Sequence, residues 1–167
     1  MHPNVKALIE REYAAQKSQE WLALRGNMLT ASDVATALGQ NKYQSPDDLL
    51  RKKCGIDEPF TGNEATAHGT RLEPVACEMF EQKYNLKVYE LGLIPHPDHP
   101  WLGGSPDGLT ENNCLLEIKC PLRRKIIPRE VPLCYEGQIQ VCMEIMDVES
   151  CYFCQYQPQE LTGPAPE

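Results

Sequence analysis

The hydrophobic positions near the start of the chain recur at helical spacing, and polar capping residues mark where helices are expected to begin. Val5, Leu8 and Ile9 lie on one face of an amphipathic stretch. Ser18 can cap a second helix that carries the apolar side chains of segment 21–24. The N-terminal part of the chain is therefore predicted to be helical.

Three more helices follow. One is expected over residues 30–39, and another over residues 45–55, where Pro46 occupies the first helical position. The longest is expected over about residues 63–83, with apolar side chains on one face. Pro74 interrupts this pattern, so the helix either bends there or begins closer to the proline.

The spacing then changes from helical to alternating. Residues 87–94 alternate as one strand would, and a proline-rich loop follows. Four further elements are expected: a short strand with a sharp turn over 101–108, a strand over 114–119 that pairs with it as a hairpin across 108–113, a helix over 132–146 and a strand over 151–157.

The predicted order is a group of helices followed by a small sheet that one helix crosses. This order predicts an α/β (α+β) fold around one core. The expected architecture is a small mixed central sheet flanked by helices, preceded by a helical N-terminal part. Residues 1–157 are expected to form a single domain. Residues 158–167, which contain three prolines, are expected to form a flexible tail.

Composition narrows the classes of protein. Of the 167 residues, 41% are hydrophobic and 24% are charged, so a globular protein is expected and wholesale disorder is excluded. No apolar run approaches the roughly 20 residues that cross a bilayer, and segment 1–12 lacks the apolar stretch of a signal peptide. We therefore expect a soluble intracellular protein with no membrane partner.

The chain is acidic, with a net charge of −8. This argues against a protein that binds nucleic acid through a generally basic surface. It does not exclude an enzyme whose carboxylates hold cations against a phosphate.

Eight cysteines are present, and without a secretory signal they are expected to be reduced. Cys151 and Cys154 are three apart on a predicted strand, so their sulfurs are expected on opposite faces. The cysteines are interpreted mainly as small buried hydrophobic residues, with a structural zinc-binding protein as an alternative. His96 and His99 lie in a rigid proline-containing turn and are not expected to bind metal.

The predicted hairpin carries the candidate chemistry. Asp107 is expected at the end of one strand, while Glu117 and Lys119 project from one face of its neighbour. Carboxylates that meet in a buried place need a cation between them, and hard oxygen ligands favour Mg²⁺ or Mn²⁺. The lysine can orient or deprotonate a water molecule, or stabilise charge on an attacked phosphate.

The alternative is a surface hairpin with a solvated Glu–Lys pair. Residues 115, 116 and 118 are apolar, which predicts that at least one side of this strand is buried. Glu117 and Lys119 are then expected to emerge into a cleft or onto an open face.

Together these residues resemble a known family. Ser105-Pro-Asp-Gly followed by Leu116-Glu-Ile-Lys-Cys-Pro is similar to the active-site hairpin of the PD-(D/E)XK nuclease superfamily, and more narrowly of the phage lambda exonuclease or YqaJ-like viral recombinase family. Segments 21–33, 68–74 and 135–140 resemble further motifs of that family in the correct order. The resemblance spans about residues 21–156 and implies a restriction-endonuclease-like core.

The resemblance implies roles at the hairpin. Asp107, Glu117, the carbonyl of Ile118 and Glu73 would bind metal, and Lys119 would be the catalytic lysine. An ordinary exposed glutamate is the alternative interpretation of Glu73. Gln138 would orient the lysine or the attacking water. Gln140 is a rival for that role, but Tyr135 shares a helix face with Gln138.

The resemblance also implies a DNA surface. Arg25 would grip a terminal 5′ phosphate, with Ser32 and Ser105 as further phosphate contacts. The alternatives are that Arg25 pairs with Glu20 and that Ser32 caps its own helix. The basic residues Arg123, Arg124 and Lys125 are candidates for a DNA-backbone track, with the basic segment 51–53 as a weaker second.

The implied function is a Mg²⁺-dependent deoxyribonuclease, with Mn²⁺ as a substitute, that degrades linear double-stranded DNA from a 5′ end in phage or viral recombination. The resemblance further implies a single-strand annealing protein as partner, a homotrimeric ring and, for a viral protein, the host cytoplasm or nucleus. An endonuclease of the same fold, including iron–sulfur relatives, and a non-catalytic DNA-binding module remain alternatives.

Overall fold

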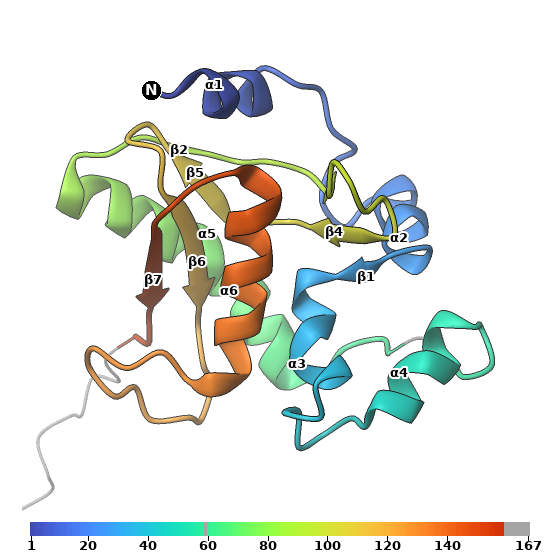
Figure 1. The fold of residues 1–167 in the computed structure, drawn as a ribbon. Helices are drawn as coiled ribbons and strands as arrows, with labels where there is room; N and C mark the ends of the chain where they lie inside the picture. Colours follow the sequence, from blue (N-terminus) through green and yellow to red (C-terminus); the bar gives the residue numbers. More distant parts are fainter. Residues whose placement is uncertain (59, 159–167) are drawn as a thin grey trace, which may run out of the picture.

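A computed structural model describes residues 1–58 and 60–158. In chain order they form α1 (Pro3–Ile9), α2 (Gln19–Gly26), β1 (Leu29–Thr30), η1 (Ala31–Asp33), α3 (Val34–Ala37), α4 (Pro46–Lys53), α5 (Glu64–Tyr84), β2 (Val88–Tyr89), β3 (Ile94–Pro95), β4 (Leu102–Gly104), β5 (Gly108–Thr110), β6 (Leu115–Lys119), α6 (Leu133–Met146) and β7 (Cys151–Gln155) (Figure 1).

The predicted helix starts are confirmed. The Ser18 hydroxyl accepts a hydrogen bond from the Trp21 amide at 3.2 Å, and Ser45 accepts one from the Asp48 amide at 3.1 Å. Each satisfies an amide that has no partner within its own helix. The longest helix, α5, runs without a break from Glu64 to Tyr84 and contains Pro74 in its interior.

The strands form two sheets. Strands β2, β5, β6 and β7 lie side by side in that order; β5 and β6 are antiparallel, and β6 and β7 are parallel. Strands β1, β4 and β3 form a second, three-stranded sheet. The expected mixture of parallel and antiparallel strands is present, but it is divided between two sheets.

The prediction of one strand over residues 87–94 was wrong. The segment contains β2 and the first residue of β3, and these strands pair with β5 and β4 in different sheets. Between them, Gly92 lies so close to Tyr13 that an added Cβ would be 2.3 Å from the Tyr13 Cβ. Alternating hydrophobicity indicates an extended, half-buried backbone. It does not indicate with which sheet each part of that backbone pairs.

The first strand of the hairpin is also not the one predicted from the sequence. Residues 102–104 form β4 in the three-stranded sheet, and β5 pairs with β6 instead. Asp107 therefore lies between β4 and β5 and does not end a strand of the hairpin. Pro106 has no amide to donate to a sheet ladder, which fits the break at this point.

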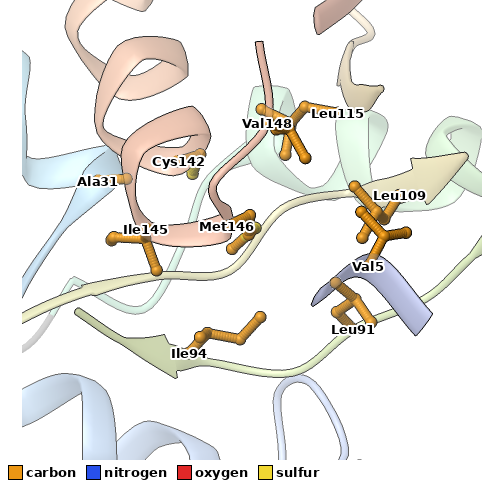
Figure 2. Close-up of a cluster of buried hydrophobic side chains, with 10 residues drawn as sticks. All are labelled: Val5, Ala31, Leu91, Ile94, Leu109, Leu115, Cys142, Ile145, Met146 and Val148. Atoms are coloured by element: carbon orange, nitrogen blue, oxygen red, sulfur yellow. The ribbon is translucent and has the colours of Figure 1, made fainter. Parts of the chain in front are cut away.

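Helices α5 and α6 cover opposite faces of the larger sheet, with α6 in front of β6 and α5 behind it in Figure 1. A first core cluster, drawn in Figure 2, joins α6 and α1 to the sheets: Val5, Ala31, Leu91, Ile94, Leu109, Leu115, Cys142, Ile145, Met146 and Val148. A second cluster packs α5 against β6: Ala76, Phe80, Leu116 and Ile118. Strand β6 is therefore buried on both faces.

Cys151 packs against the first cluster and Cys154 against the second, which confirms that their sulfurs face opposite ways. All eight cysteines are free thiols. Among the described residues, no helix is long and apolar enough to cross a membrane. The predicted tail, 158–167, lies outside the described residues apart from Pro158.

Candidate active site

Strand β6 presents Glu117 and Lys119 on its α6 face. The Glu117 side chain is fully buried, and its Oε1 accepts hydrogen bonds from the Lys119 Nζ and from the Gln138 Nε2, the latter at 2.7 Å. The other oxygen, Oε2, is buried and has no hydrogen-bond partner within the described residues. Two donors therefore fix one oxygen of the carboxylate, whereas the second oxygen is held by none of the described residues.

Burial raises the pKa of Glu117 to about 7. The Lys119 ammonium lowers this pKa, while the nearby Asp107 carboxylate raises it. Burial alone would lower the pKa of Lys119, but the Glu117 and Asp107 carboxylates outweigh burial and raise it. Lys119 is therefore a cation near neutral pH, and its Nζ also lies 5.0 Å from the centroid of the Tyr135 ring.

Asp107 lies at the edge of β6, beyond the point where β5 leaves it. The last β5 residue paired with β6 is Gly108, opposite Leu116, and the Asp107 Oδ2 then accepts a hydrogen bond from the Ile118 amide at 2.6 Å. In a strand, the N–H and C=O of one residue point to the same side, so the Ile118 carbonyl faces this edge as well. Burial raises the pKa of Asp107.

Glu73 comes to the same place from α5. Together with Asp107, Ile118 and Lys17, it lines a cavity of about 440 Å³. Burial raises the pKa of Glu73, and the Asp107 carboxylate raises it further. Glu73 is half-buried and is not an ordinary exposed glutamate.

The acidic side chains converge from two sides. Glu73 approaches β6 from the α5 face, Glu117 lies on the α6 face, and Asp107 lies at the edge between them. Within 1–58 and 60–158, no three His, Cys, Asp or Glu side chains already stand close enough to hold a metal ion. The carboxylates are neighbours, and a common ion would have to draw them together.

Gly137 allows α6 to approach its neighbours beside the site. A Cβ at this position would lie 2.8 Å from the Val34 Cγ1 of α3. Gln138 follows and points to Glu117, whereas Gln140 is exposed to solvent. Of the two glutamines considered from the sequence, only Gln138 contacts the carboxylates.

The predicted phosphate contacts fall into two groups. The Arg25 guanidinium donates a hydrogen bond to the Ser32 hydroxyl at 2.8 Å and lies 4.6 Å from the centroid of the Trp21 ring. Arg25 forms no ion pair with Glu20, so that alternative was wrong. Ser105 lies just before Asp107, and its hydroxyl is buried without a hydrogen-bond partner within the described residues.

The basic residues after β6 lie in the connection to α6. Arg123 pairs with Glu64 at 3.2 Å, and both side chains are exposed. Arg124 donates a hydrogen bond to the Gln155 Oε1 at 2.8 Å, and Lys125 is exposed. Only Arg124 is tied to the sheet that carries the carboxylates.

Sequence reasoning missed Lys17, which lines the carboxylate cavity. Its backbone is left-handed, with φ 67°, a conformation that lysine rarely adopts. It also missed the ion pair between Lys53 and Asp33, whose Nζ and Oδ2 are 2.8 Å apart. The Thr30-x-x-Asp33 pattern is a capping-box signal that could have identified Asp33, but no local signal identifies Lys53.

His96 does not join the site. Its Nδ1 accepts hydrogen bonds from the amides of Asp98 and His99 at 3.1 and 3.2 Å, as expected of a tight turn.

Comparison with known proteins gives two kinds of relative. Curated relatives include the uncharacterized protein R354 of Acanthamoeba polyphaga mimivirus, which is 31% identical over 84% of this chain and 29% of its own length. Protein D345L of African swine fever virus is 30% identical over 75% of this chain and 44% of its own length. The uncharacterized protein YqaJ of Bacillus subtilis is 26% identical over 78% of this chain and 43% of its own length. The chain thus spans less than half of these relatives.

Among solved structures, the alkaline exonuclease LHK-Exo from Laribacter hongkongensis is similar, with a TM-score of 0.74 and 31% identity over 86% of this chain and 76% of that one. Its complex with dAMP gives a TM-score of 0.72. These similarities confirm the α/β (α+β) fold class with a restriction-endonuclease-like core. The profile of the YqaJ-like viral recombinase domain matches residues 20–160, and the chain therefore belongs to the YqaJ-like viral recombinase family.

Proposed function

We propose that residues 1–157 form a single nuclease domain that hydrolyses phosphodiester bonds of linear double-stranded DNA from a 5′ end, with Mg²⁺ or Mn²⁺ as cofactor, in viral-type DNA recombination. The observation that carries this proposal is the asymmetry of Glu117. One of its oxygens is fixed by Lys119 and Gln138, and the other is buried without a partner within the described chain.

The residues fit a hard divalent cation. A buried carboxylate that is ionised and leaves one oxygen without a hydrogen-bond partner is costly unless a cation meets that oxygen. Asp107, Glu117, Glu73 and the Ile118 carbonyl offer only oxygen atoms, which favour Mg²⁺ or Mn²⁺ over softer metals. When bound, such an ion offsets negative charge on the phosphate and makes a water molecule more acidic.

The remaining side chains orient the reacting groups. Lys119 is a cation beside Glu117, so it can donate to a phosphate oxygen on which charge develops. Gln138 holds Glu117 in one orientation, and Tyr135 limits where the Lys119 ammonium can move. Arg25, Ser32 and Ser105 would contact DNA phosphates, and Arg123, Arg124 and Lys125 would follow the DNA backbone.

The nuclease proposal is supported by the structural similarity to an alkaline exonuclease. We propose two partners on family grounds alone: a single-strand annealing protein that receives the product, and two further copies of the chain in a ring. Size-exclusion chromatography with light scattering tests the trimer.

The test is digestion of linear duplexes that carry 5′-phosphate, 5′-hydroxyl or hairpin-closed ends, with Mg²⁺ or with EDTA. We expect Mg²⁺-dependent loss of the open duplexes, blocked by EDTA, and intact closed ends. Asp107→Ala with Lys119→Ala is expected to reduce the rate by at least about 10³-fold, because charge stabilisation and positioning are lost together.

Unchanged digestion by this double variant would contradict the proposal that these residues form the nuclease site. Cleavage of covalently closed circles would favour an endonuclease of the same fold. DNA binding without any metal-dependent cleavage would favour a binding module.

A further inference from the structure

Five residues near α2 form a closed ring of hydrogen bonds outside the carboxylate site, through four side-chain contacts and one main-chain carbonyl. The Arg25 guanidinium donates to the Ser32 hydroxyl at 2.8 Å, and Ser32 and Thr30 hydroxyls are 3.0 Å apart. The Thr30 hydroxyl donates to the Asp33 Oδ2 at 2.8 Å. Lys53 of α4 closes the ring, because its Nζ lies 2.8 Å from the Asp33 Oδ2 and donates to the Arg25 carbonyl at 3.0 Å.

The direction of every hydrogen bond in this ring is determined. The Asp33 carboxylate only accepts, so the single proton of the Thr30 hydroxyl points to Asp33. Thr30 must then accept from Ser32, whose own oxygen accepts from Arg25. With the Ser32 proton committed to Thr30, an anion at this place is received by the N–H groups of Arg25 that Ser32 does not use.

Lys53 and Asp33 are the shielded part of the ring. Their side chains are only 21% and 12% exposed, so water screens their attraction weakly. Burial raises the pKa of Asp33, but hydrogen bonds from Lys53 and Thr30 outweigh burial and bring it below its ordinary value. Ser32, in contrast, is exposed and accessible to a ligand.

One helix connects the ring to the carboxylate site. Helix α6, which carries Gln138, packs against both η1 and β6. Figure 1 shows α2, α3 and α4 grouped on the side of α6 away from β7. A shift of Ser32 and Arg25 would therefore change where a bound phosphate lies relative to Glu117.

We propose that Lys53 and Asp33 are positioning residues that hold Arg25 and Ser32 as one preassembled unit for the 5′-terminal phosphate of DNA. This inference rests on the proposed function, in which Arg25 receives that phosphate, and Ser32 holds the Arg25 guanidinium in place for it. Lys53 fixes the main chain of Arg25, and Asp33 fixes Ser32 through Thr30. The unit is then ordered before DNA arrives, so little side-chain entropy is lost when DNA binds.

The test uses the ratio of two affinities of the full chain, measured by fluorescence anisotropy in EDTA: that for a 5′-phosphorylated duplex end and that for a 5′-hydroxyl end. We expect wild type to prefer the phosphorylated end by roughly 10-fold or more, as for hydrogen bonds to a charged group. Lys53→Met and Arg25→Ala are each expected to lose most of this preference. Lys53→Arg is expected to retain part of it.

Lys52→Met is the matched control. It removes the same charge from the same helix, and the Lys52 side chain forms no hydrogen bond or ion pair with the described residues. Removing one positive charge weakens the general electrostatic attraction to DNA and so lowers the affinity for both duplexes equally. Only a change in the ratio of the two affinities therefore indicates a change in positioning. Lys52→Met is expected to keep the wild-type ratio.

A second variant separates positioning from folding. Asp33→Asn with Lys53→Met removes both shielded charges, so it is expected to regain part of the thermal stability lost in Lys53→Met but not the preference. Recovery of both, an unchanged ratio in Lys53→Met, or no preference in wild type would each overturn the inference. Absence of Mg²⁺-dependent digestion, with the ratios behaving as expected, would instead contradict the nuclease proposal alone.

Discussion

Glu117 has two oxygens in different surroundings, and Gln138 is one cause of that difference. The Gln138 amide donates to Oε1 at 2.7 Å, the same oxygen that Lys119 contacts. Without Gln138, Lys119 alone would hold the carboxylate, which could then rotate and offer either oxygen. The position of a metal ligand would be less well defined, and the buried charge would lose a stabilising hydrogen bond.

Gln138→Ala is therefore expected to lower Mg²⁺-dependent nuclease activity by about 10- to 100-fold, the usual effect of removing a group that orients a metal ligand. Activity is measured as a function of Mg²⁺ concentration, and part of the loss should be recovered at high Mg²⁺. Gln140→Ala is the control on the same helix, because Gln140 is exposed, and its activity should equal that of wild type. Equal losses in the two variants would contradict the assignment.

Some contacts between individual residues could be predicted from the sequence and others could not. Strand alternation places Glu117 and Lys119 on one face, and their contact follows from it. Helical spacing pairs Tyr135 with Gln138, and both face Lys119 or Glu117. The contact between Lys53 and Asp33 joins two elements that approach only in the folded chain, so neither periodicity nor capping could identify it.

Helix α6 connects the two halves of the proposed DNA site because it packs against η1 and α3 on one side and β6 on the other. Residue 137 allows this approach, since a Cβ there would lie 2.8 Å from Val34 Cγ1. Gly69 also lies within a helix, α5, but a Cβ there would meet no atom of the described residues within 4 Å. Gly137 is therefore required by close helix packing, whereas packing does not require a glycine at position 69.

Gly137→Ala is expected to lower the free energy of unfolding by about 1–3 kcal/mol, because the methyl group forces α6 and α3 apart. Gly69→Ala is expected to raise it by roughly 0.5–1 kcal/mol, because alanine loses less backbone entropy in a helix. Urea unfolding monitored by circular dichroism measures both. Stabilisation by Gly137→Ala would show that the helices do not pack as closely as described.

Elements were predicted well where their cause is local. Caps such as Ser18 and Ser45 determine where helices begin, and both positions were predicted correctly. The division of residues 87–104 between two sheets was not predicted, because sheet partners are determined by contacts distant in sequence. Asp107 was consequently placed at a strand end, although its proximity to the Glu117 strand was anticipated.

Across the whole molecule, a net charge of −8 coexists with carboxyl groups whose pKa values burial raises: Glu73, Asp107 and Glu117. For Glu117, the ordinary pKa is 4.5 and the folded value is about 7. Between these values the folded state holds a proton that the unfolded chain has released. The contribution of Glu117 to the free energy of unfolding is therefore greatest below about pH 4.5 and is lost as pH rises to about 7.

A divalent cation should reverse this loss, because it takes the place of the proton. Metal and proton compete for the same carboxylate, so stabilisation by Mg²⁺ is expected to be larger at pH 8 than at pH 6. The measurement is the thermal unfolding midpoint of wild type and Glu117→Gln, with EDTA or with Mg²⁺, at pH 5, 6 and 8. In EDTA, the difference between the two proteins isolates Glu117 from other titrating groups, and wild type should lose stability relative to the variant as pH rises. A Mg²⁺ shift that is equal at both pH values, or that persists in Glu117→Gln, would place the ion elsewhere in the molecule.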